Sequence, residues 1–236
     1  MMPRIAVFGA GSVGCFVGGL WRNAGLDVTL IGRPAVRDAL ADNGLRLTGH
    51  DGLDIALHGV PFETAPSAMA EVELVVVTVK STATAEAAEH IAAHAPQATP
   101  VLSLQNGISN VDILREALPG YTVLRGMVGF NVAWLGDGRL HKGTSGLLAA
   151  EQHPLTEELA RTLRATPGEL FLTDEPLALA WGKLLLNLNN AINALSGKTL
   201  LAELSERSYR RVLAASMREA LSVLTAAGIS PAKVGP

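Results

Sequence analysis

The segment that most constrains the fold of this 236-residue chain is the apolar run and glycine-rich turn IAVFGAGSVG at residues 5–14. Residues 4–8 read as a strand, residues 12–24 as a helix and residues 27–31 as a second strand, which together form one βαβ unit. In the G-x-G-x-x-G spacing, Gly9 permits a sharp turn, Gly11 lets the backbone approach a diphosphate, and Gly14 lets the helix pack closely on the strand. The diphosphate is expected on free helix N–H groups. The predicted dinucleotide-binding residues are Gly9, Ala10, Gly11, Ser12, Val13 and Gly14. The alternative is a glycine-rich turn that binds nothing.

The same apolar run, which follows Arg4, also fits the core of a secretory signal. A signal peptide requires a small-residue cleavage site next, whereas here the helix ends at Gly25 and a strand begins at Val28. We therefore expect a cytoplasmic protein. No later apolar run approaches the roughly 18 residues that span a membrane. Cys15, the only cysteine, excludes an internal disulfide and a cysteine metal cluster, and we expect it to pack on the first helix.

Composition limits the class of partner. With 48% apolar and 17% charged residues, the chain can bury a sizeable core. The 19 basic and 22 acidic side chains give a net charge of −3, and no basic run is present. We therefore expect a small-molecule substrate, and neither a nucleic acid nor an anionic membrane as partner.

The end of the second strand indicates which dinucleotide binds. An NAD enzyme places a carboxylate there against the ribose 2′-hydroxyl, whereas this chain has Gly32-Arg33. A guanidinium suits the 2′-phosphate of NADP, so the sequence favours NADPH. Two alternatives stay open: Arg37 takes the phosphate instead, or Arg33 is a solvated loop residue before Pro34.

Further alternation of strands and helices predicts a mostly parallel sheet with helices on both faces. We expect strands near residues 71–79, 100–104, 122–128, 139–142, 146–149 and 170–173, and helices at residues 82–95 and 154–165. Lys80 and Asn106 follow two of these strands, at the strand ends where ligands bind in such sheets. We place both in the cofactor crevice, although each alone also fits a surface lysine or a turn asparagine.

Helical signals dominate after Pro176, so the predicted fold class is α/β. A Rossmann-type NADP-binding domain, residues 1–175, precedes the start of an all-helical substrate domain, residues 176–236. Residues 180–197 read as one helix that contains several asparagines among leucines. Such amides are costly in a helix and need a reason, either a structural amide network or a substrate cleft. On an ideal helix Lys183, Asn187 and Asn190 form one stripe, which suits a proton donor beside neutral amides that hold a small polar substrate.

His90 and His94 stand at i,i+4 on a predicted helix, a spacing that also occurs in metal sites. No third ligand is evident in the sequence, so we favour a solvated helix face and no metal.

At this point the chain resembles the ketopantoate reductase (2-dehydropantoate 2-reductase) family. The matching features are the turn at residues 9–14, Arg33, Val79-Lys80, Gln105-Asn106-Gly107, and the helix at residues 181–197 with Lys183. The resemblance implies NADPH-dependent reduction of ketopantoate to pantoate. It also implies that Lys80 and Asn106 contact the cofactor, that Asn106 and Asn187 bind substrate, and that Lys183 is the proton donor to the ketone.

Two features depart from the family pattern. The second substrate asparagine is expected four residues after Asn187, where this chain has Ala191. The local sequence Asn193-Ala194-Leu195-Ser196 indicates Asn193 as the counterpart. On an ideal helix, however, Asn193 lies about 80° away from the stripe that contains Lys183. A π-type insertion is one way to reconcile the two, so Asn190 and Asn193 both remain candidates.

The family also continues for several helices that supply a serine and a glutamate, and we expect this chain to be part of a longer protein. If Pro236 were the true end, a nucleotide-binding sensor without turnover would be an alternative. A reductase of another small 2-oxo or 3-hydroxy acid is a second alternative. A homodimer is compatible with the sequence, which does not fix the oligomeric state.

Overall fold

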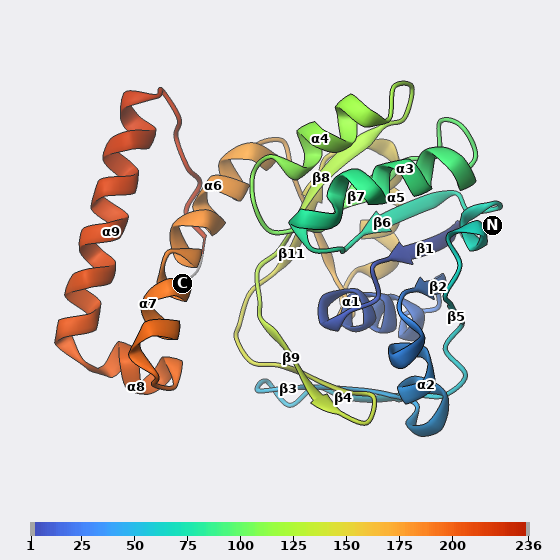
Figure 1. Ribbon diagram of the computed structural model, residues 1–236, viewed down its shortest axis with the longest axis horizontal. Helices are drawn as coiled ribbons and strands as arrows, with labels where there is room; N and C mark the ends of the chain where they lie inside the picture. The colour runs from blue at the N-terminus through green and yellow to red at the C-terminus, as the bar shows by residue number, and fades with distance from the viewer. Residues whose placement is uncertain (1–2, 235–236) are drawn as a thin grey trace. The chain divides into compact units, whose positions relative to one another are not determined.

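The computed structural model describes residues 3–234 and divides into two compact units between Pro176 and Leu177 (Figure 1). The first unit is built on a mostly parallel sheet with helices on both faces, and the second is helical. The predicted fold class, α/β followed by helices, is confirmed.

The central sheet of the first unit has eight strands in the order β12-β11-β8-β7-β6-β1-β2-β5. Every neighbouring pair is parallel except β8 and β11, which are antiparallel. The strands are β1 (Arg4–Phe8), β2 (Asp27–Ile31), β5 (Phe62–Glu63), β6 (Leu74–Val77), β7 (Val101–Ser103), β8 (Val123–Val128), β11 (Leu148–Glu151) and β12 (Leu170–Thr173). Strands β6 and β8 are buried along their whole length, as expected for strands covered on both faces.

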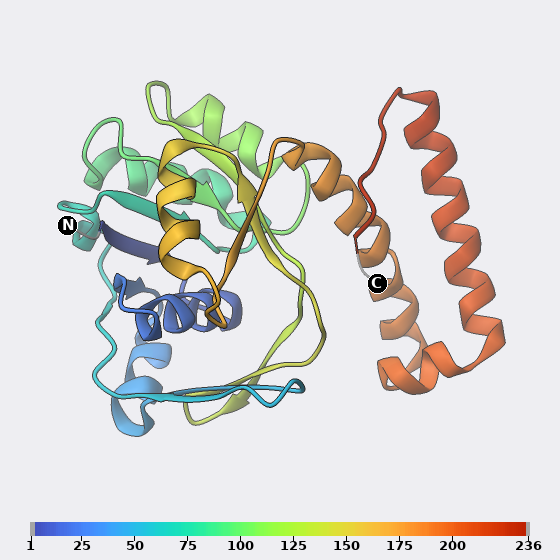
Figure 2. The same ribbon diagram turned by 180° about the vertical axis from the view of Figure 1, so that it is seen from behind.

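Helices cover both faces of this sheet (Figures 1 and 2). On one face α1 and α5 pack with the sheet in a core that contains Phe16 and Leu159, and on the other α3 and α4 cover a core that contains Ile91 and Leu114. The helices are α1 (Ser12–Asn23), α2 (Pro34–Asn43), α3 (Thr84–His94), α4 (Asn110–Ala117) and α5 (Pro154–Leu163), with short 3-10 turns η1 (Pro66–Met69) and η2 (Ser81–Ala83). Cys15 is buried on α1, as expected, and burial raises the pKa of its thiol to about 12.

A second sheet, which the sequence patterns did not reveal as a separate layer, covers the other side of α1. Its strand order is β4-β3-β10-β9, with bounds β3 (Leu45–Gly49), β4 (Asp54–Leu57), β9 (Val132–Gly136) and β10 (Arg139–Lys142). Because α1 lies between two sheets, its residues from Gly14 to Trp21 are all buried. The strand expected at residues 146–149 is shifted, since β11 begins at Leu148 and Gly146 instead packs against the Gly129 carbonyl.

The second unit contains α6 (Pro176–Asn187), α7 (Asn189–Ser196), α8 (Leu200–Ser205) and α9 (Arg207–Ala226). The single helix predicted over residues 180–197 is therefore wrong, because the helix is interrupted at Leu188. The Leu188 nitrogen lies 3.2 Å from the Leu184 carbonyl oxygen and 3.3 Å from the Leu185 carbonyl oxygen, so its N–H is shared between the acceptors four and three residues earlier. Among the described residues, no helix is both long and apolar enough to cross a membrane.

Candidate functional site

The carboxyl ends of four neighbouring strands meet at one edge of the central sheet. The register pairs Phe8 of β1 with Ile31 of β2 and with Val77 of β6, and Val77 with Ser103 of β7. The loops that leave these four ends contain Gly9, Arg33, Lys80 and Asn106. The sheet thus places the predicted cofactor residues of the first unit along the edge where ligands of such folds bind.

The turn after β1 needs glycine at two positions. Gly9 has φ +99°, and a Cβ there would lie 2.5 Å from the Val79 backbone nitrogen. A Cβ on Gly14 would lie 2.5 Å from Thr78 Oγ1, and the Thr78 hydroxyl donates to the Gly9 carbonyl at 2.9 Å. The N–H groups of Gly9 and Ala10 both donate to the Ile31 carbonyl, at 2.9 Å each. These contacts hold the turn tightly against β2 and the end of β6.

Gly11, in contrast, has open space where a side chain would be. It is the N-cap of α1, no side chain caps this helix, and a Cβ on Gly11 would meet only the Gly9 carbonyl, at 3.9 Å. The first N–H groups of a helix have no acceptor within the helix, and the helix dipole favours an anion there. The beginning of α1 at Ser12 and Val13 therefore has the general features of an anion site, and the diphosphate that the glycine spacing predicts there stays a prediction.

The two candidate arginines for the adenosine end differ in their contacts. Arg33 is exposed at the N-cap of α2, and within residues 3–234 its guanidinium has no ion-pair partner. Arg37 donates two hydrogen bonds to Asp38, at 2.9 and 2.8 Å. Arg33 is thus the more available group for a phosphate.

Lys80 and Asn106 are both exposed, and a partly buried polar network holds their two loops together. The Gln105 amide donates to the Val79 carbonyl at 3.1 Å and to Thr84 Oγ1 at 2.8 Å. The Asn110 amide, which is buried, donates to Ser81 Oγ at 3.1 Å and to the Asn106 carbonyl at 2.6 Å.

No sequence pattern indicated a role for Gln105, Thr84 or Asn110. The signal available for them was their polarity within segments that the fold buries. Their hydrogen bonds cross-link the loop after β6 and the loop after β7, and so fix the backbones of Lys80 and Asn106.

In the second unit Lys183 lies on α6 and is half-buried, and burial lowers the pKa of its ammonium group. Asn187 follows on α6 and is also half-buried, whereas Asn190 is exposed on α7. The Asn193 amide donates to Glu203 Oε2 at 2.9 Å and to the Lys198 carbonyl at 3.2 Å. The one helix expected to carry the stripe is divided into α6 and α7 at Leu188, which itself has φ −57° and ψ −27°.

Two other features do not belong to this edge. His90 and His94 stack at 6.3 Å between ring centroids, and no group of three or more histidine, cysteine, aspartate or glutamate residues within residues 3–234 is arranged to hold a metal.

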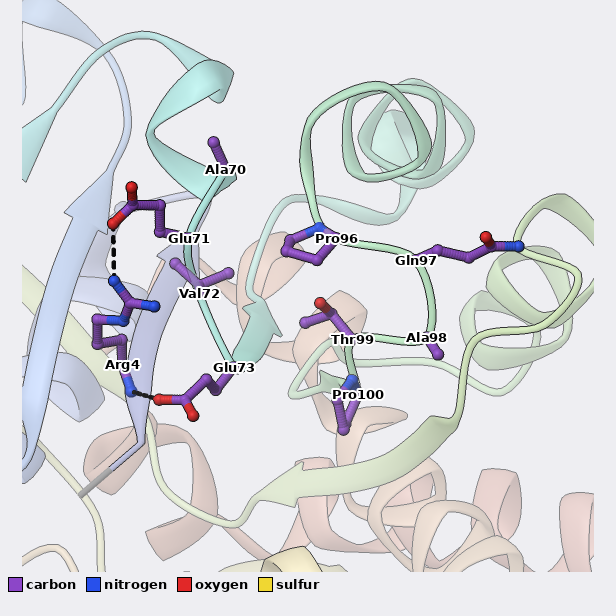
Figure 3. Close-up of a pocket in the computed structure, with 10 residues that line it drawn as sticks. All are labelled: Arg4, Ala70, Glu71, Val72, Glu73, Pro96, Gln97, Ala98, Thr99 and Pro100. Atoms are coloured by element: carbon purple, nitrogen blue, oxygen red, sulfur yellow. Dashed lines mark hydrogen bonds and ion pairs between the residues drawn. The ribbon is translucent and has the colours of Figure 1, made fainter. Parts of the chain in front are cut away.

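A shallow pocket lies at the opposite, amino ends of β1, β6 and β7 (Figure 3). Arg4 in this pocket is paired with Glu71 at 2.7 Å, and its backbone N–H is bound by Glu73 at 3.0 Å.

Comparison with known proteins gives consistent matches. A family model described as "Ketopantoate reductase PanE/ApbA" matches residues 5–154. The 2-dehydropantoate 2-reductase of Halobacterium salinarum is 32% identical over 234 residues, which is 96% of this chain and 77% of that protein. The enzyme of the same name from Pyrococcus abyssi is 32% identical over 199 residues, which is 80% of this chain and 62% of that protein.

Solved structures match over nearly the whole chain. A PanE/ApbA family ketopantoate reductase from Ralstonia eutropha has a TM-score of 0.85 at 31% identity, with 98% of this chain and 76% of that chain covered. A 2-dehydropantoate 2-reductase from Geobacter metallireducens has a TM-score of 0.81 at 28% identity, with 93% and 74% covered. This chain therefore spans part of the length of each relative.

Proposed function

This chain belongs to the ketopantoate reductase PanE/ApbA family of oxidoreductases, and we propose from that membership that it reduces ketopantoate to pantoate with NADPH. The observation that carries the proposal is the family match over residues 5–154, because it includes the glycine turn and the loops after β6 and β7. The product is a hydroxy acid, so the reaction needs a hydride for the keto carbon and a proton for its oxygen.

The strand-end loops support NADPH as the hydride source. The N-terminal turn of α1 fits the diphosphate, since Gly11 leaves its surface open and no side chain occupies the cap. Arg33, whose guanidinium has no ion-pair partner within residues 3–234, is the proposed contact for the 2′-phosphate, a group that NADPH has and NADH lacks. Lys80 and Asn106 are proposed to contact the nicotinamide half. When bound, NADPH supplies the hydride that the keto carbon accepts.

Lys183 is the proposed proton donor to the keto oxygen. An ammonium group donates efficiently when its pKa is close to the working pH, and burial lowers the pKa of Lys183 from its ordinary high value. The proton moves from Lys183 Nζ to the oxygen as the C=O bond becomes C–OH. A positive charge beside the carbonyl also stabilises negative charge that develops on the oxygen during hydride addition.

The asparagines are proposed to hold the substrate. A carboxamide both donates and accepts, so Asn106 and Asn187 suit a molecule that presents a carboxylate, a carbonyl and a hydroxyl. Asn190 and Asn193 are the two candidates for a further amide contact. Because these amides are neutral, Lys183 supplies the positive charge among the proposed substrate contacts.

The test is steady-state oxidation of NADPH by ketopantoate, compared with other small 2-oxo acids and with NADH. We expect ketopantoate with NADPH to give the largest kcat/KM. Lys183→Ala is expected to lower kcat by about 100-fold or more, the usual contribution of a general acid. A better rate with another 2-oxo acid would reassign the substrate. Binding of NADPH with no turnover of any keto acid would contradict the proposal.

A further inference from the structure

Arg125 carries a charge inside the first unit that the proposed reaction does not use. It lies on β8, and only 7% of its side chain is exposed. The alternate positions of the same strand, Val123 and Met127, are apolar and buried. Burial lowers the pKa of the Arg125 guanidinium, which means that its surroundings disfavour the charge. An apolar side chain would fill this position without that cost, so the arginine needs a reason.

The guanidinium of Arg125 reaches the loop that follows β7. Its Nη1 donates to the Ile108 carbonyl at 2.8 Å, and its Nη2 lies 3.7 Å from Asp112 Oδ1 on α4. The sheet register explains this reach, because Arg125 pairs with Ser103, the last residue of β7. A charged donor makes a stronger hydrogen bond to a carbonyl than a neutral donor does. Arg125 therefore ties this loop to β8.

The same loop carries Asn106, which the proposed function assigns to the cofactor and the substrate. The Asn106 carbonyl accepts hydrogen bonds from Asn110 Nδ2 at 2.6 Å and from Ser81 Oγ at 3.2 Å. Gly107, which separates Asn106 from Ile108, has φ +102°, and a glycine by itself restricts the backbone little. The loop is thus held by one anchored carbonyl on each side of a permissive residue. Loss of the Ile108 anchor leaves the backbone free to change at Gly107 and to move Asn106.

Arg115 offers a contrast within the same cluster of charges. It also donates to a backbone carbonyl, that of Val123 at 3.0 Å, and it pairs with Glu151 at 3.4 Å. Glu151 in turn accepts from the Arg125 backbone N–H at 3.0 Å. These contacts join α4, β8 and β11 to one another, but they involve no residue of the loop at 104–109. Arg115 is therefore the natural comparison for the loop contact of Arg125.

We propose that Arg125 is a positioning residue that fixes the loop at residues 104–109 through the Ile108 carbonyl, and so sets the place of Asn106 against NADPH and the keto acid. This inference rests on the proposed function, because that function gives Asn106 its role. Arg125 acts on the reaction through the backbone of this loop.

The test is a double-mutant cycle between Arg125 and Asn106, with kcat/KM for ketopantoate measured at saturating NADPH. R125M keeps an unbranched apolar chain but has no donor. We expect kcat/KM to fall about 10- to 100-fold, the range for a reacting group that is displaced by about 1 Å. N106A has already lost the amide, so adding R125M to it should lower kcat/KM by less than about twofold further. R125K keeps one charged donor and should lose less than R125M.

R115M is the matched control. It removes a guanidinium that binds a backbone carbonyl and a carboxylate in the same cluster, but it leaves the contact with Ile108 in place. Some loss of stability in urea is expected, with kcat/KM for ketopantoate within about twofold of the unmodified chain.

Three results would overturn the inference. They are an unchanged kcat/KM in R125M, an equal loss from R125M with and without N106A, or an equal loss in R115M. If R125M does not fold by circular dichroism, R125K takes its place in the cycle. A loss in R125K that disappears when N106A is present supports the inference, and a loss that persists with N106A, or no loss, overturns it.

Two other results separate this inference from the proposals beneath it. An unchanged kcat/KM in N106A would overturn the role of Asn106, and with it the role of Arg125, while the reductase activity stands. No turnover of ketopantoate by the unmodified chain would overturn the proposed function itself, and this inference with it.

Discussion

Replacing Gly9 or Gly11 with alanine separates the two tasks of the glycine turn, folding and cofactor binding. Both substitutions add one methyl group, and the two positions are two residues apart. At Gly9 the backbone has φ +99° and the new Cβ would lie 2.5 Å from the Val79 nitrogen. At Gly11 the backbone is extended, with φ −94° and ψ −158°, and the new Cβ would meet only the Gly9 carbonyl, at 3.9 Å.

The magnitudes follow from these environments. At Gly9, an unfavourable backbone conformation costs about 1–3 kcal/mol, and forcing a methyl group against packed backbone costs about 1–3 kcal/mol more. Gly9→Ala should therefore lower the free energy of unfolding by about 2–6 kcal/mol, a large part of the about 5–15 kcal/mol of a typical domain. Gly11→Ala should lower it by about 1 kcal/mol or less, because alanine is a poorer N-cap than glycine but meets no packed atoms there. Its methyl group would instead occupy the space of a diphosphate oxygen, and losing one charged hydrogen bond weakens binding about 10- to 100-fold.

Urea unfolding measures the first quantity, and titration of NADPH fluorescence measures the second. The unmodified chain and Gly25→Ala serve as controls. Gly25 lies outside the glycine turn at residues 9–14, and nothing lies within 4 Å of its Cβ position. Its φ of +92° makes some loss of stability expected in Gly25→Ala, but no loss of NADPH affinity. Unchanged NADPH affinity in a folded Gly11→Ala protein would refute the placement of the diphosphate. Equal destabilisation by Gly9→Ala and Gly11→Ala would refute the steric reasoning.

Three further predictions follow from the site. Arg33→Ala should weaken NADPH binding about 10-fold or more and leave NADH binding unchanged, whereas Arg37→Ala should leave both affinities unchanged, because Arg37 is held by Asp38; an equal loss for both dinucleotides in Arg33→Ala would contradict the 2′-phosphate role. Asn110→Ala removes the amide that links Ser81 to the Asn106 carbonyl, so we expect about 1–3 kcal/mol less stability in urea and a higher KM for NADPH; a change in neither would show that the network does not hold the loops. Burial lowers the pKa of Lys183, and the donor must be protonated, so kcat should fall as pH rises through that lowered pKa and the break should lie below the ordinary lysine value of 10.5; a profile that stays flat through that value would exclude Lys183 as the donor.

Much of the first unit could be predicted because its patterns are local. The strands at Arg4–Phe8 and Asp27–Ile31 and the helix that begins at Ser12 lie where the apolar periodicity and the glycine spacing indicated. Such segments are defined by neighbours within a few residues, so the sequence alone contains the information.

The second sheet could not be predicted in the same way. Strand β3 pairs with β10, which lies about ninety residues later, and no short-range pattern reports that pairing. The only sequence trace of this layer is that α1 is apolar around its whole circumference, as a helix between two sheets must be.

The asparagine segment shows the same limit at the site. An ideal helix over residues 180–197 puts Lys183, Asn187 and Asn190 on one stripe. The structure divides this segment into α6 and α7 at Leu188, and Glu203 of α8, ten residues beyond Asn193, accepts hydrogen bonds from Asn189 and Asn193. The asparagines themselves indicated a structural amide network as one alternative, but no local pattern linked them to the carboxylate of Glu203.

The most direct test of the central claim follows one deuterium atom. NADPH that carries deuterium at both C4 positions of the nicotinamide is supplied to the chain with ketopantoate, and the product is analysed by mass spectrometry. The proposed reaction predicts pantoate that carries one deuterium at C2, formed in step with NADPH oxidation and reduced about 100-fold or more in rate by Lys183→Ala. Oxidation of the cofactor without labelled pantoate, or no pantoate at all, would contradict the account.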